Sequence, residues 1–143
     1  MHQYVVDNDK RRTLNIAYPT MSFCSYISYV HEQPSNQIIQ AIEEVYVLYI
    51  TKENLEYLIK ENPRFCYIAY RLLEKVHLER EIRAYILQYN SAFTRFEKFI
   101  KLDRKAAFYL KFVSQKLIAS YIGLTPQSFS KAKKLYMSQD VIS

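Results

Sequence analysis

The sequence predicts an α+β protein in which strands come first and helices follow. Short segments rich in β-branched and aromatic residues, some of them alternating with polar residues, occupy the first 50 positions. Beyond residue 51, apolar residues recur every three or four positions, which is the spacing of helices that bury one face. The chain has 143 residues and 50% of them are hydrophobic, so it can build a core as one mid-sized domain or two small ones.

The N-terminal segment predicts strands. QYVV and RRTLNIAY read as two strands around the polar turn DNDK, and Pro19 closes the second. QIIQAI, residues 37–42, and VYVLYI, residues 45–50, are predicted to be adjacent strands, with the second buried on both faces. We therefore expect the first 50 residues to be mostly sheet.

A helix is expected over residues 52–62. Thr51 has the side chain of a helix N-cap, and Pro63 is expected to end the helix. Its apolar residues Leu55, Leu58 and Ile59 fall on one face.

A much longer helix is expected from about Arg64 to Tyr89. At 1.5 Å per residue a helix of this length spans about 39 Å, more than a small domain can cover. Glu79 alone interrupts its apolar stripe, which predicts a dimerisation seam, although the stripe could also pack only on the chain's own sheet. The predicted dimerisation residues are Phe65, Ile68, Leu72, Val76, Ile82 and Ile86.

Two further helices, over about 93–102 and 106–112, precede the most informative segment. Leu117 to Ile122 predict a short helix, and Gly123, the only glycine of the chain, permits the positive φ of a sharp turn. Thr125 can cap the next helix, and Pro126 suits its first position. This pattern predicts a helix-turn-helix, although a generic helical hairpin would share part of it.

The second helix of this pair offers side chains that can read DNA. Phe129, Ala132 and Tyr136 are expected to point inward, which leaves Gln127, Lys131 and Lys134 on the opposite face with Ser128 beside them. Lys116 suits a phosphate contact. The candidate DNA-binding residues are Thr125, Gln127, Ser128, Lys131, Lys134 and Lys116.

The charge distribution supports a polyanionic partner. Residues 94–143 hold ten Lys or Arg against three acids, a net charge of +7, whereas residues 1–93 have a net charge of −1. Any single lysine could still be an ordinary solvated side chain.

Several classes of function have little support. No nucleophile, base or phosphate-loop pattern indicates an enzyme, and the three dispersed histidines and two distant cysteines predict neither a metal site nor a cofactor. We interpret Cys24 and Cys66 as buried structural thiols. No apolar run is long enough for a membrane span and no secretion signal is evident, so we expect a cytoplasmic protein that does not bind membranes.

The order of these elements resembles the cyclic AMP receptor protein and FNR (Crp/Fnr) family of bacterial transcription factors. The residues that carry the resemblance are QPSNQIIQAIEEVYVLYITKENLEYLIKENP, residues 33–63, and QKLIASYIGLTPQSFSKAKK, residues 115–134. The resemblance implies a partial jelly-roll-like β-barrel of the cyclic-nucleotide-binding type over residues 1–63, a dimerisation helix over 64–92 and a DNA-binding domain over 93–143. It places Thr125, Gln127, Ser128 and Lys131 at positions that the family uses on DNA, with lysine replacing a common arginine at Lys131.

Two departures from the family matter for function. The segment SFCSYISYVHEQPSNQIIQA lacks the glycine and arginine that hold a nucleotide phosphate, so cyclic AMP binding is not expected. The barrel also lacks its early strands, so subunits could exchange strands, the dimer could cover the open edge, or the chain could be a shortened relative.

The leading hypothesis is therefore a homodimeric, sequence-specific transcriptional regulator that binds double-stranded DNA without responding to cyclic AMP. One alternative is a protein-interaction module with a vestigial DNA-binding domain. Another is a sensor of an uncharged small ligand held by Phe23, Tyr26, Tyr29 and Tyr46, although aromatic residues at strand spacing are more often core.

Overall fold

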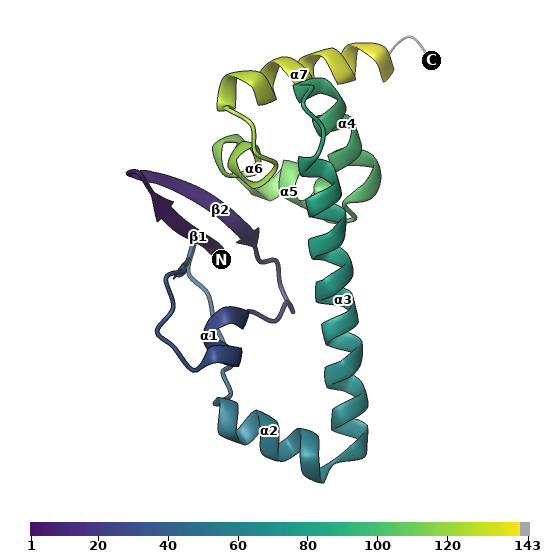
Figure 1. The fold of residues 1–143 in the computed structure, drawn as a ribbon. Coiled ribbons are helices and arrows are strands. Elements are labelled where there is room, and N and C mark those ends of the chain that lie inside the picture. Colours follow the sequence, from purple (N-terminus) through teal and green to yellow (C-terminus); the bar gives the residue numbers. More distant parts are fainter. Residues whose placement is uncertain (141–143) are drawn as a thin grey trace. The chain divides into compact units, whose positions relative to one another are not determined.

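The computed structural model describes residues 1–140 and confirms an α+β protein. Among these residues it contains one three-stranded antiparallel sheet and seven helices. Figure 1 traces the chain from its first two strands to its last helix. The chain divides into two compact units, residues 1–73 and 74–143, and the boundary falls inside the long helix. The C-terminal half of that helix therefore belongs to the same unit as the helices that follow it. The last three positions of the expected 93–143 domain, residues 141–143, lie outside the described residues.

The sheet begins with the predicted hairpin. Strands β1 (His2–Asp7) and β2 (Lys10–Ile16) pair antiparallel around Asn8 and Asp9, which both have positive φ, 48° and 59°. Two consecutive left-handed residues form the turn that matches the natural twist of a hairpin. The third strand, β3 (Ile38–Gln40), pairs antiparallel with the other edge of β1, which gives the order β2-β1-β3.

The expectation that the first 50 residues are mostly sheet is wrong. The segment predicted as a strand over 37–42 forms only β3, and helix α1 (Tyr26–His31) lies in the loop between β2 and β3. Residues 45–50 form no strand, and Tyr46, Leu48 and Tyr49 are almost fully exposed instead of buried on both faces. A β-rich segment becomes a strand only beside a partner, and apolar content alone does not identify that partner. The described residues thus contain a small sheet, and the jelly-roll-like barrel stays a prediction.

Helix α2 (Lys52–Glu61) begins as expected, because the Thr51 hydroxyl accepts a hydrogen bond from the Asn54 N–H at 3.3 Å. Pro63 does more than end α2: it is the first residue of helix α3 (Pro63–Leu87), where its missing N–H costs nothing. The Asn62 side chain caps α3 by accepting from the N–H groups of Arg64 and Phe65, both at 3.1 Å. Asn62 is therefore the single residue between the two helices, and Pro63 begins the second.

The C-terminal unit is helical and has an aromatic core. Helices α4 (Ala92–Leu102), α5 (Ala106–Phe112), α6 (Gln115–Tyr121) and α7 (Pro126–Asp140) follow the end of α3, and α7 packs on α4 and α6. The rings of Phe96 and Phe129 meet edge to face at 5.3 Å, as do those of Tyr109 and Tyr121 at 5.6 Å. These four rings are buried and hold the helices together.

The expectation that Ile86 lies on a dimerisation surface is wrong. Ile86 is fully buried within the chain, so it belongs to the core of the C-terminal unit rather than to a surface that a second copy could cover. Helical spacing identified an apolar stripe, but it could not separate the part of the stripe that α4–α7 occupy from the part that stays open.

Candidate nucleic-acid interface

The turn between α6 and α7 is built by Gly123. Its φ is +68°, and the N–H groups of Gly123 and Leu124 donate to the carbonyls of Ser120 and Ala119 at 3.2 and 2.8 Å. This pair of bonds is the Schellman arrangement, which ends a helix with a left-handed residue and satisfies its last carbonyls. The local geometry predicted for Gly123 is therefore present.

The start of α7 is fixed by Thr125 and Ser128. The Thr125 hydroxyl accepts from the Ser128 N–H at 3.1 Å and donates to the Ser128 hydroxyl at 2.9 Å. Pro126 occupies the first helical position, as expected. Both hydroxyls are engaged in the cap, so Ser128 shapes the helix start rather than offering a free hydroxyl as the sequence suggested.

The two faces of α7 differ as predicted. Phe129 and Ala132 are buried, and the Tyr136 ring contacts the Phe96 ring at 5.7 Å. The opposite face is polar and exposed, and it consists of Gln127, Ser130, Lys131, Lys134 and Ser138. We call these five residues the polar face of α7.

Sequence reasoning missed two members of this face, Ser130 and Ser138. Ser130 is exposed and lies three positions after Gln127 and four before Lys134, so helical periodicity alone contained the signal. A hydroxyl at this position can donate to or accept from a base edge.

Lys116 is exposed in the first turn of α6. Within the described part of the chain, no hydrogen bond or ion pair is made by the side chains of Lys116, Gln127, Lys131 and Lys134. Their polar groups are therefore available to an external anion or base edge.

Three other basic residues, Arg95, Arg83 and Lys105, are occupied inside the unit. Arg95, on α4, donates to the Gly123 carbonyl at 2.8 Å. Arg83, on α3, donates to the Tyr121 carbonyl at 2.9 Å, with its guanidinium 4.9 Å from the centre of the Tyr121 ring. The basic excess expected for residues 94–143 therefore overstates the charge offered to solvent, because it counted Arg95 and Lys105.

A buried polar cluster lies behind the end of α6. The Lys105 side chain is 8% exposed and its ammonium pairs with Glu79 of α3 at 3.1 Å. The Tyr121 hydroxyl donates to an Asp103 carboxylate oxygen at 3.1 Å. Burial and the nearby Asp103 charge raise the pKa of Tyr121, so its hydroxyl keeps the proton that it donates. Burial lowers the pKa of Arg83, which still remains charged at neutral pH because an arginine titrates so far above it.

The predicted dimerisation residues are not equivalent. Ile68 and Leu72 are 54% and 45% exposed, whereas Phe65, Val76 and Ile82 are half-buried and Ile86 is buried. Helix α3 thus offers an apolar surface around Ile68 and Leu72, and Tyr67, Leu73 and Leu78 add to its exposed apolar area.

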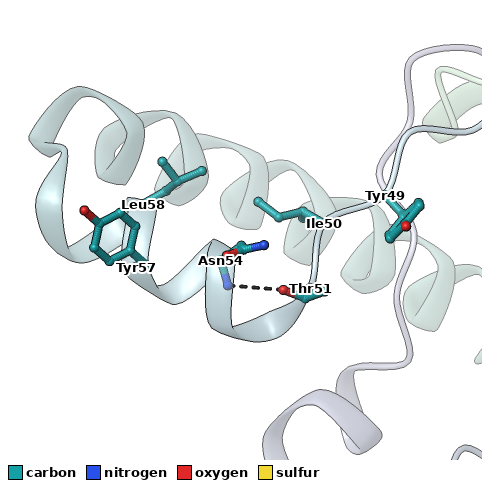
Figure 2. Close-up of a pocket in the computed structure, with 6 residues that line it drawn as sticks. All are labelled: Tyr49, Ile50, Thr51, Asn54, Tyr57 and Leu58. Atoms are coloured by element: carbon teal, nitrogen blue, oxygen red, sulfur yellow. Dashed lines mark hydrogen bonds between the residues drawn. The ribbon is translucent and has the colours of Figure 1, made fainter.

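An open hollow lies beside the start of α2 in the N-terminal unit. Its volume is about 550 Å³, and it is lined by Tyr49, Ile50, Thr51, Asn54, Tyr57 and Leu58 (Figure 2). None of Phe23, Tyr26, Tyr29 and Tyr46, which were considered for a small ligand, lines this hollow.

Other chemistry is sparse in residues 1–140. The described residues bring together no three His, Cys, Asp or Glu side chains in the manner of a metal site. Cys24 and Cys66 are both exposed, which corrects the expectation of buried thiols. His2 is buried in the sheet and shares a 3.0 Å hydrogen bond with Thr13. In the part of the chain that the structure describes, no helix combines the length and apolarity of a membrane span.

Comparisons with protein-family models, curated proteins and solved structures found no match to this chain. The family resemblance read from the sequence therefore stays a prediction, and function has to be argued from the geometry of the C-terminal unit.

Proposed function

We propose that this protein is a sequence-specific DNA-binding regulator of transcription that acts as a homodimer. The observation that carries the proposal is the polar face of α7, which stands opposite the buried Phe129 and Ala132. A helix that is anchored on one side and exposes Gln and Lys on the other suits the major groove, as in the second helix of a DNA-binding helix-turn-helix.

The chemistry of this face fits base edges. Gln127 can pair with the N6 and N7 atoms of adenine, and Lys131 and Lys134 can donate to the O6 and N7 atoms of guanine. Lys116, on the preceding helix, suits a backbone phosphate, which positions the protein without specifying sequence.

The homodimer rests on the exposed apolar residues of α3. Ile68 and Leu72 lie one helical turn apart and are about half exposed, so a second α3 could bury both. A twofold dimer would read two half-sites about 34 Å apart, one turn of the double helix.

We also propose that the protein does not respond to cyclic AMP. The Ser35 hydroxyl accepts from the Gln37 N–H at 3.0 Å, and the Gln37 side chain accepts from Gln3 at 2.6 Å. These neutral groups satisfy one another and offer no cation to a phosphate.

One observation favours a second candidate, a protein-interaction module. Residues 45–50 belong to no helix or strand and expose Tyr46, Leu48 and Tyr49, residue types that are typical of protein interfaces. In that case the C-terminal unit would not discriminate between DNA sequences.

The test is a selection of random duplex DNA on the full chain, followed by affinity measurements at two salt concentrations. Enrichment of a near-palindrome and a steep loss of affinity with salt are expected, because each phosphate contact releases counterions. The double substitution Lys131→Ala, Lys134→Ala should weaken binding to the selected site by about 100-fold, because each base contact contributes about 1–3 kcal/mol.

The matched control removes the same charge from α4 and α5 through Lys98→Ala and Lys111→Ala. It should keep the selected sequence preference even if overall affinity falls. Retention of full specific affinity by the α7 variant, or the absence of any enriched sequence, would refute the proposed function.

A further inference from the structure

The Arg95 side chain joins the ends of two helices that are far apart in sequence. From α4, its Nε donates to the Tyr89 carbonyl at 2.8 Å, and its Nη2 donates to the same carbonyl and to that of Leu87, the latter at 3.3 Å. Its Nη1 donates to the carbonyls of Gly123 at 2.8 Å and Ile122 at 3.4 Å. One guanidinium therefore binds both the end of α3 and the turn before α7.

The chemistry of this contact explains why arginine suits the position. The last carbonyls of a helix have no partner within the helix, and a cation there also interacts favourably with the helix dipole. A guanidinium presents its N–H groups in a rigid plane, so it can serve two separate sets of carbonyls at once. A lysine ammonium at the same place has no such fork.

Gly123 accommodates the same guanidinium. A Cβ atom added at Gly123 would lie 3.0 Å from Arg95 Nη1 and 3.0 Å from the Leu87 side chain. The absent side chain thus permits both the turn and the approach of Arg95 and α3.

Two other contacts connect α3 to the same region. Arg83 donates to the Tyr121 carbonyl at the end of α6, and Glu79 pairs with Lys105 just before α5. Together with the buried Ile86, they place the C-terminal half of α3 within the unit that contains α7.

From these contacts we infer that Arg95 is a positioning residue that fixes the direction of α7 relative to the C-terminal half of α3. The inference rests on the proposed function for its consequence: in the dimer, each α7 would keep one direction relative to the C-terminal half of its own α3. A DNA-bound dimer would then favour one half-site spacing.

The first test measures the joint without DNA. In a Cys24→Ser, Cys66→Ser background, spin labels are attached at Glu81→Cys on α3 and Ser138→Cys on α7, and labelled chains are diluted with unlabelled ones. Electron spin resonance should give one narrow intramolecular distance distribution for the parent and a broadened one for Arg95→Lys. Lys101→Met, an exposed change on α4, should leave it narrow. A broad distribution in the parent, or a narrow one in Arg95→Lys, would overturn the inference.

The second test uses the selected DNA site with its half-sites moved apart or together by about two base pairs. This change also rotates one half-site about the DNA axis relative to the other, which a rigid dimer cannot follow. The parent should prefer the selected spacing, and Arg95→Lys should reduce that preference about fivefold or more, in line with the loss of one to two hydrogen bonds. A purely stabilising role would lower the melting temperature and weaken all spacings equally, which would contradict the inference. If the parent binds no DNA, the proposed function fails while the spin-label distances still decide the role of Arg95.

Discussion

Gly123 shows how much one residue can determine in this chain. Its left-handed backbone ends α6, and the space left by its missing side chain is occupied by Arg95 and Leu87. The turn was predictable from the sequence because a lone glycine between two helical patterns is a local signal. The contact with Arg95 was not predictable, because residues 95 and 123 are far apart in sequence and arginine in a basic segment looks like a surface charge. The same reasoning hid the buried Lys105, and it overrated Ser128, whose hydroxyl turned out to cap α7.

Gly123→Ala should destabilise the C-terminal unit by about 1–3 kcal/mol, because it adds left-handed strain and a contact with Arg95. Urea unfolding followed by far-UV circular dichroism measures the change. Ser130→Ala, an exposed substitution on α7, is the control and should shift stability by less than about 0.5 kcal/mol. A Gly123→Ala variant as stable as this control would contradict the role assigned to the turn.

At the scale of elements, helices were easier to predict than strands. Helix starts are encoded locally by caps such as Thr51 and by prolines at the first position, and the structure contains them. The prediction of a strand over residues 45–50 was wrong because a strand needs a partner from elsewhere in the chain. None of the described strands lies beside these residues. Helix α3 was predicted in extent, whereas the division of its apolar stripe into core and surface depended on the packing of α4–α7.

The Lys105–Glu79 pair provides a test of how much this ion pair stabilises the packing of α3 in the C-terminal unit. Lys105→Met should cost about 2 kcal/mol of unfolding free energy, because it leaves the Glu79 carboxylate largely buried without a partner. Adding Glu79→Met should restore at least half of the loss, which urea unfolding of both variants would reveal. The exposed Lys101–Glu97 pair, at 2.6 Å, is the matched control, and Lys101→Met should cost less than about 0.5 kcal/mol. Equal losses at the two pairs would show that Lys105 does not hold α3.

On the scale of the whole molecule, the two units differ in the side chains that they bury and expose. Residues 1–73 carry the sheet and much of the exposed apolar surface, and residues 74–143 carry the aromatic core and the polar face of α7. The sequence revealed this separation through its charge, near neutral in residues 1–93 and basic beyond. It did not reveal that the boundary would fall inside α3.

The proposed dimer depends on the first half of α3. Ile68→Glu with Leu72→Glu should give monomers in sedimentation experiments, because two charged side chains would face each other across the twofold axis. Circular dichroism should remain unchanged, since both residues are exposed in the single chain. The control His77→Glu, an exposed change on α3 outside the apolar stripe, should leave the dimer intact. Persistence of the dimer in the double variant would move the interface away from α3.

The exposed segment 45–50 has a consequence for the behaviour of the protein in concentrated solution. An uncharged run of β-branched and aromatic residues without proline has the composition of segments that stack into cross-β aggregates. Glu43 and Glu44 precede this run and Lys52 and Glu53 follow it closely. Like charges brought into register by stacking repel one another, so we expect these four side chains to oppose such stacking while the segment stays exposed.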